Sequence, residues 1–86
     1  MPTIPTIHDN GTPKAALLAA LTAADEAIGK AAKVLVQTAP NARDYYPQGP
    51  DAWGKARDEW TEIQTQLRTI REKVVAAMVH IHEQAR

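Results

Sequence analysis

One long pattern of apolar positions fills the second half of the chain. Nine apolar residues follow one another at alternating spacings of three and four residues: Trp53, Ala56, Trp60, Ile63, Leu67, Ile70, Val74, Ala77 and Ile81. Residues at these spacings share one side of an α-helix and form a seam that packs against another helix. The pattern predicts a helix over residues 51–84, with Asp51 as its N-cap.

A second, shorter pattern precedes the first. Six apolar residues stand four and three positions apart: Leu17, Leu21, Ala24, Ile28, Ala31 and Leu35. They predict a helix over residues 13–39. Thr12 is the expected N-cap and Pro13 the first helical residue, a position at which the missing N–H of proline is tolerated. Pro40 is expected to end this helix.

The two remaining segments are predicted to lack regular helix. Residues 1–12 are expected to form an extended arm, because Pro2 and Pro5 disfavour helical backbone. The arm carries Ile4 and Ile7, which can anchor it on the helices. Residues 40–50 hold three of the six prolines and are expected to form a loop.

Together these elements predict an all-α fold in one domain of residues 1–86. It is an antiparallel two-helix hairpin with an extended N-terminal arm. The second helix is about two turns longer than the first, so we expect its end to overhang and to need cover from the arm or a neighbour. Two helices enclose no core, and we therefore expect a homo-oligomeric helical bundle, a dimer or larger. The overhanging apolar residues are Val74, Val75, Met78, Val79 and Ile81.

The composition narrows the possible functions. Ten basic and ten acidic residues leave no net charge, whereas proteins that hold duplex nucleic acid are basic. The chain has no cysteine and no serine, so thiolate metal sites and the usual nucleophiles are missing. His80 and His82, two residues apart, lie on different sides of a helix and cannot chelate one ion. We expect no enzyme activity, no cofactor, no metal and no duplex nucleic acid partner.

The same sequence is expected to be cytoplasmic. It shows no basic stretch followed by an apolar run at its start, as a signal peptide would. The longest uncharged, apolar-rich segment, residues 15–24, is about half of the ~20 residues that a membrane span needs. We therefore expect no membrane partner.

Polar residues suited to a site are concentrated in two segments, and the first is His8-Asp9-Asn10-Gly11-Thr12-Pro13. It stands directly before the first predicted helix, where free N–H groups and the positive end of the helix dipole favour anions. The alternative is that the segment forms only a turn and a cap. The candidate ligand-binding residues are His8, Asn10, Gly11 and Thr12.

The second segment is Asn41-Ala42-Arg43-Asp44-Tyr45-Tyr46-Pro47. An arginine fork, an amide and two adjacent rings are suited to the recognition of phosphate and bases. The alternative is a cap on the hairpin, in which the rings cover the end of the bundle and Arg43 pairs with Asp44 or Asp51. The candidate ligand-binding residues are Asn41, Arg43, Asp44, Tyr45 and Tyr46.

Geometry separates the two segments. They lie at opposite ends of the first predicted helix, which at 1.5 Å per residue is ~39 Å long. They cannot share a ligand within one protomer, and they meet only if a second protomer packs head to tail beside the first. Lys30 and Lys33, one turn apart on the same helix, either hold a phosphate or simply face solvent.

The order of motifs resembles a family of small phage and prophage proteins over nearly the whole chain. The resemblance rests on Ile7-His8-x-Asn10-Gly11-Thr12, an Ala/Leu helix, Asn41-x-Arg43-Asp44-Tyr45-Tyr46-Pro47-Gln48-Gly49 and a final helix. Small helical phage oligomers with paired end motifs are similar to anti-defence sponges, which trap the cyclic nucleotide signals of CBASS or Thoeris immunity without cleaving them. Pro13 departs from the family pattern, which has Ser there, and removes a hydroxyl contact.

This resemblance implies a non-catalytic phage accessory protein that sequesters a small anionic ligand, a cyclic nucleotide immune signal, at protomer junctions. Arg43, His8 and the start of the first helix would contact phosphate. Tyr45 and Tyr46 would stack on bases, and the two asparagines would contact base or ribose edges. The alternative is a helical protein–protein interaction module acting on a host or phage protein.

Overall fold

The computed structural model describes residues 3–85, so residues 1–2 of the predicted arm and residue 86 lie outside it. Within this range the chain forms helices and no strands, which confirms the all-α prediction. The elements are α1 (Lys14–Leu35), a 3-10 turn η1 (Val36–Thr38), α2 (Ala42–Tyr45), a 3-10 turn η2 (Tyr46–Gln48) and α3 (Ala52–His82).

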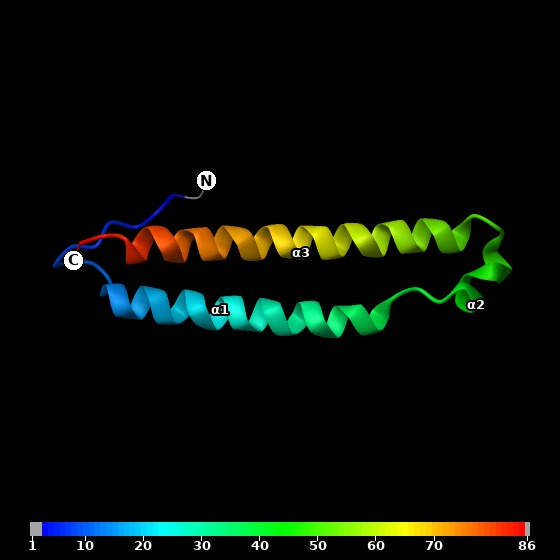
Figure 1. Cartoon of the computed structure of the whole chain (residues 1–86), viewed down its shortest axis with the longest axis horizontal. Helices are drawn as coiled ribbons and strands as arrows, with labels where there is room; N and C mark the ends of the chain where they lie inside the picture. The colour runs from blue at the N-terminus through cyan, green and yellow to red at the C-terminus, as the bar shows by residue number, and fades with distance from the viewer. Residues whose placement is uncertain (1–2, 86) are drawn as a thin grey trace.

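The two long helices lie side by side and run in opposite directions, with α2 at the tip where the chain turns (Figure 1). The molecule measures 62 × 21 × 17 Å, and its buried core is small. Of the described residues, only Ile7, Gly29 and Ile81 are buried, and the Ile81 side chain is 1 % exposed. No helix among residues 3–85 combines the length and the apolar character needed to cross a membrane.

Polar contacts set the register of the helix pair. The indole N–H of Trp60 donates to the Leu35 carbonyl at 3.1 Å. Arg71 Nε donates to Asp25 Oδ1 at 2.8 Å near the middle of both helices. The Lys14 ammonium donates to the Gln84 carbonyl at the far end.

This register places the end of α3 beside the start of α1, and the overhang predicted at that end is wrong. α3 has 31 residues against 22 in α1, and the extra turns lie at its beginning, next to α2 (Figure 1). Ile81 is buried and Val74 is half-buried, while Val75 and Val79 stay exposed.

Most residues of the predicted seams are half-buried or buried, among them Leu21, Leu67 and Ile81. However, Ala24 and Ala31 of α1 are exposed, and Ile63 and Ile70 of α3 are each 50 % exposed. The contact line also includes residues outside the predicted seams, namely Asp25, Gly29 and Ala32 of α1 and Gln64 of α3, all half-buried or buried.

The Asp25–Arg71 ion pair accounts for the polar residues at this contact line, because it joins a side chain of α1 to a side chain of α3. A Cβ at Gly29 would lie 2.8 Å from Arg71 Nη2, so the guanidinium occupies space that only glycine leaves open.

The helix ends differ from the predictions as well. α1 begins one residue later than expected, with Pro13 at the N-cap and no side-chain cap, so the assignment of Thr12 as the cap is wrong. Asp51 does occupy the N-cap of α3, but its side chain accepts no capping hydrogen bond.

The predicted loop of residues 40–50 holds α2 and η2. Asn41 Oδ1 accepts the Arg43 N–H at 3.0 Å and caps α2, which explains why a helical turn forms there. Gly49, at φ 117°, then turns the chain into α3 with a backbone conformation that other residues rarely adopt.

Ile81→Ala is expected to lower the free energy of unfolding by about 2–5 kcal/mol, because it removes a fully buried side chain. Val79→Ala, in the same part of α3, is the matched control. Val79 is exposed, and its change should be about 0.5 kcal/mol or less. Urea unfolding followed by far-UV circular dichroism measures both, and equal effects would contradict the burial of Ile81.

Candidate functional site

The two predicted site segments lie at opposite ends of the molecule (Figure 1). Residues 8–12 are at the end where α1 begins and α3 finishes, and residues 41–46 are at the tip. In a molecule 62 Å long, no small ligand reaches both segments of one chain. The structure therefore forms two separate candidate regions, called here the arm end (residues 5–14 and 81–84) and the tip (residues 40–57).

The arm end is held together by Gln84. Its side-chain Oε1 accepts the Ile7 N–H at 2.9 Å, and its Nε2 donates to the Pro5 carbonyl at 2.7 Å. The Gln84 carbonyl accepts from Lys14 at the start of α1. Gln84, which follows the end of α3, thus binds both the arm and the first helix, and Ile7 is buried beside it.

A tight turn places His8 against Gly11. The Gly11 N–H donates to the His8 carbonyl at 3.1 Å, and a Cβ at position 11 would lie 2.8 Å from His8 Nε2. Of the four candidates here, His8 and Gly11 are therefore brought together. Asn10 and Thr12 are exposed.

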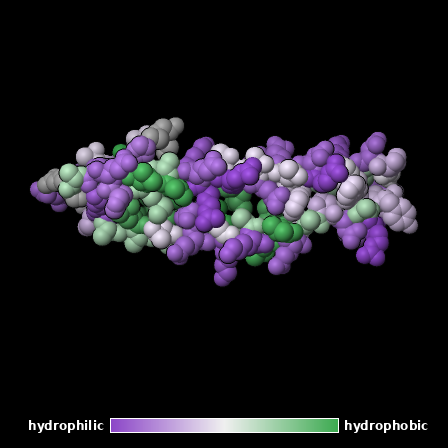
Figure 2. Space-filling model, in the orientation of Figure 1, coloured by the Kyte–Doolittle hydropathy of each residue, from purple (hydrophilic) through white to green (hydrophobic). Residues whose placement is uncertain are grey.

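On the face that Figure 2 displays, hydrophobic side chains gather over the arm end, and a second, smaller group lies among hydrophilic ones near the middle. His82 belongs to the arm end, and Nδ1 of the neighbouring His80 lies 3.8 Å from a Glu83 carboxylate oxygen. No cluster of three or more metal-binding side chains occurs in residues 3–85.

At the tip, α2 and η2 present a cation and a ring to solvent. Tyr46 is 77 % exposed, whereas Tyr45 is half-buried. Within residues 3–85 the Arg43 guanidinium makes no ion pair, so the expected alternative pairing with Asp44 or Asp51 does not form. Arg43 and Tyr46 are three residues apart across one helical turn and lie on the same side of it.

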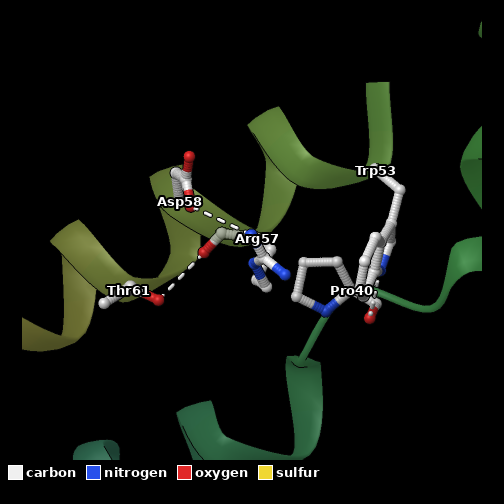
Figure 3. A network of polar contacts seen from close by, with 5 residues as sticks. All are labelled: Pro40, Trp53, Arg57, Asp58 and Thr61. Carbon is white, nitrogen blue, oxygen red and sulfur yellow. Dashed lines mark hydrogen bonds and ion pairs between the residues drawn. The ribbon is translucent and has the colours of Figure 1, made fainter. Parts of the chain in front are cut away.

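The tip rests on an indole that the apolar pattern counted as part of the seam. Trp53 Nε1 donates to the Pro40 carbonyl at 3.3 Å, and the Arg57 guanidinium lies 4.9 Å from the centre of the Trp53 ring. Figure 3 shows both side chains extending from α3 toward Pro40. The residue after Pro40 is Asn41, so these contacts hold the start of α2.

Sequence reasoning missed the supporting residues at both ends. Arg57 stands four residues after Trp53, a spacing that brings helical side chains together, and this signal was available. Lys14 and Gln84 carried no signal, because their contact spans 70 residues.

A shallow hollow on the middle of the helix pair collects further charge. It has a volume of about 520 Å³ and is lined by Glu26, Gly29, Lys30, Lys33 and Arg71. The hydrogen bond and charge of Asp25 raise the pKa of Arg71, which stays fully charged. Asp25 already binds Arg71. The lining cations of this hollow that make no ion pair within residues 3–85 are Lys30 and Lys33.

Comparison of the chain with protein-family models, with curated proteins and with solved structures finds no match in any of the three.

Gln84→Leu is expected to release the arm, because leucine keeps the approximate volume but makes neither hydrogen bond. At about 1 kcal/mol for each bond, protection of the Ile7 amide against hydrogen exchange should fall roughly tenfold or more. Gln37→Leu, a change at an exposed glutamine of η1, is the control and should leave that protection unchanged. Unaltered exchange at Ile7 in Gln84→Leu would show that Gln84 does not hold the arm.

Proposed function

We propose that this chain is a non-catalytic phage or prophage accessory protein of the bacterial cytoplasm. It assembles from antiparallel hairpins into a homo-oligomeric bundle and sequesters a small anionic ligand, a cyclic nucleotide, between protomers. The motif resemblance around Ile7–Thr12 and Asn41–Gly49 supports the family. The ligand class is supported by the chemistry of the tip.

This proposal rests on two observations: Arg43 makes no ion pair within residues 3–85, and the Tyr46 ring is exposed. An arginine without an ion pair in residues 3–85 can give two parallel hydrogen bonds to a phosphate. A tyrosine ring 77 % exposed offers its face to a base, and stacking on such rings is independent of base identity. Both side chains stand on one helical turn, which is fixed by Asn41 and by the Trp53–Pro40 hydrogen bond.

The separation of the two motifs favours a site between copies. The turn of His8 and Gly11 and the start of α1 supply N–H groups that suit a phosphate, but they are at the other end of the chain. A site that uses both motifs needs the tip of one protomer beside the arm end of another. In this proposal the site binds its ligand and releases it intact.

Cyclic di- and trinucleotides are expected to raise the melting temperature of the protein. Arg43→Ala and Tyr46→Ala should each remove most of this shift. Loss of a charged hydrogen bond costs about 1.5–3 kcal/mol, or roughly tenfold to a hundredfold in affinity. Thermal denaturation with a panel of cyclic nucleotides measures the shift, and chromatography of the heated sample should recover the ligand unchanged.

Arg68→Ala is the matched control for Arg43→Ala, because Arg68 is also exposed but lies in the middle of α3. It should keep the wild-type shift. If a hundredfold excess of every nucleotide left the melting temperature unchanged, the sequestration proposal would be abandoned. Specific capture of one host or phage protein by the same sample would then favour the interaction module.

Mixing two variants tests whether both motifs serve one site. His8→Ala and Arg43→Ala should each abolish binding and leave the oligomer intact. In a mixed oligomer, an intact His8 of one chain meets an intact Arg43 of another at some junctions, so part of the binding should return. Calorimetric titration of the mixture, after subunit exchange has been confirmed, measures this recovery. No recovery would rule out a shared pocket.

A further inference from the structure

One flank of α3 repeats every seven residues. One line of this flank consists of Ala56, Ile63, Ile70 and Ala77; both isoleucines are 50 % exposed, and the two alanines are half-buried. A second line beside it consists of Glu59, Gln66 and Lys73, all exposed. A strict repeat of seven is the period at which one helix packs along another. α1 does not cover this flank, although its pattern fits a helical partner.

The neighbouring flank of α1 carries only alanine. At about 100° per residue, Ala24 and Ala31 point roughly 80–140° away from Ala32 and Val36. Ile63 likewise points away from Thr65. The hollow on one side of the contact line is lined by Ala32, Val36, Thr61, Thr65 and Arg68, together with half-buried residues of the contact line itself. The alanines and isoleucines therefore share the opposite face of the helix pair, where small side chains allow another backbone to come close.

We infer that a second copy of this chain covers this face, with the two α3 helices antiparallel. The line Ala-Ile-Ile-Ala is the same read in either direction, so an antiparallel copy can set Ile63 opposite Ile70 of the partner subunit. In the same register Glu59 lies beside Lys73 of the partner subunit, and Gln66 lies near its own copy. The face is thus complementary to itself in shape and in charge, as an interface with two-fold symmetry must be.

Charge selects the antiparallel arrangement. Within one helix Glu59 and Lys73 are fourteen residues, roughly 21 Å, apart and cannot pair. In a parallel arrangement each would face its own copy, and like charges repel. Only the antiparallel register joins both pairs of opposite charge across the interface.

This dimer brings opposite ends of the two chains together. The start of α3 lies level with Ile81 of the partner subunit, so the tip of each chain stands beside the arm end of the other. Arg43 and Tyr46 then approach the turn of His8 and Gly11 twice in each dimer. The dimer rests on the helices alone, whereas the use of this junction as a ligand site rests on the proposed function.

Lysine substitutions test the interface. Ile63→Lys with Ile70→Lys should convert the protein to a monomer in sedimentation velocity at micromolar concentration. Val75→Lys with Val79→Lys is the matched control, because these exposed valines lie on the other side of α3. It should sediment at least as a dimer. A wild-type monomer, or equal dissociation of both variants, would overturn the inference.

Cysteine pairs test the register without disturbing the fold, because the chain has no cysteine of its own. Gln66→Cys should form a disulfide-linked dimer with itself. Glu59→Cys and Lys73→Cys should cross-link when mixed but not alone, since a disulfide needs Cα atoms within about 7 Å. Thr65→Cys, on the hollow side, is the control and should stay uncross-linked. Cross-linking of Glu59→Cys alone would indicate a parallel dimer and overturn the register. These readouts need no ligand, so they can fail independently of the proposed function.

Discussion

Two helices can bury side chains against each other only along one line of contact. In this protein few residues along that line are buried. Among residues 3–85, only Gly29, Ile7 and Ile81 are buried, the last two at the arm end, and elsewhere half-buried side chains and polar bridges connect the helices. An ion pair, Asp25–Arg71, and an indole hydrogen bond to Leu35 hold the middle and the far half. The exposed flanks of both helices follow from this shortage of contact.

The repeat of apolar positions was sufficient to predict two long helices and their approximate ends. Most of the seam positions that it predicted are half-buried or buried, among them Leu21, Leu67 and Ile81, but it did not identify every residue of the contact line. Ala24 and Ala32 differ little in apolar character, and the choice between them depends on Asp25 and Arg71, which an apolar pattern assigns to solvent. Helix lengths alone also do not determine register, so the overhang was placed at the wrong end of α3. The helix α2 has four residues and is too short for any periodicity to reveal.

The candidate site was predicted from residue chemistry, and its geometry had to come from the structure. An arginine and a tyrosine in one short segment indicated recognition of phosphate and bases. Their exposure, and the lack of an ion pair between Arg43 and any other residue of the described range 3–85, depend on how Asn41 and Trp53 fix that segment, which no local pattern specifies. The binding roles of these residues remain predictions. Assembly and ligand binding are linked in this proposal, because the residues that suit one ligand belong to different ends of the chain.

The hydrogen bonds that join the two halves of the chain span increasing sequence separations along the molecule. From the tip to the arm end, Trp53–Pro40, Trp60–Leu35, Arg71–Asp25 and Ile7–Gln84 join residues 13, 25, 46 and 77 positions apart. The entropy lost on closing a loop grows with its length. Loop closure therefore costs least at the tip and most at the arm. In the proposed site between copies, the arm end is the part whose ordering carries the larger loop-closure cost.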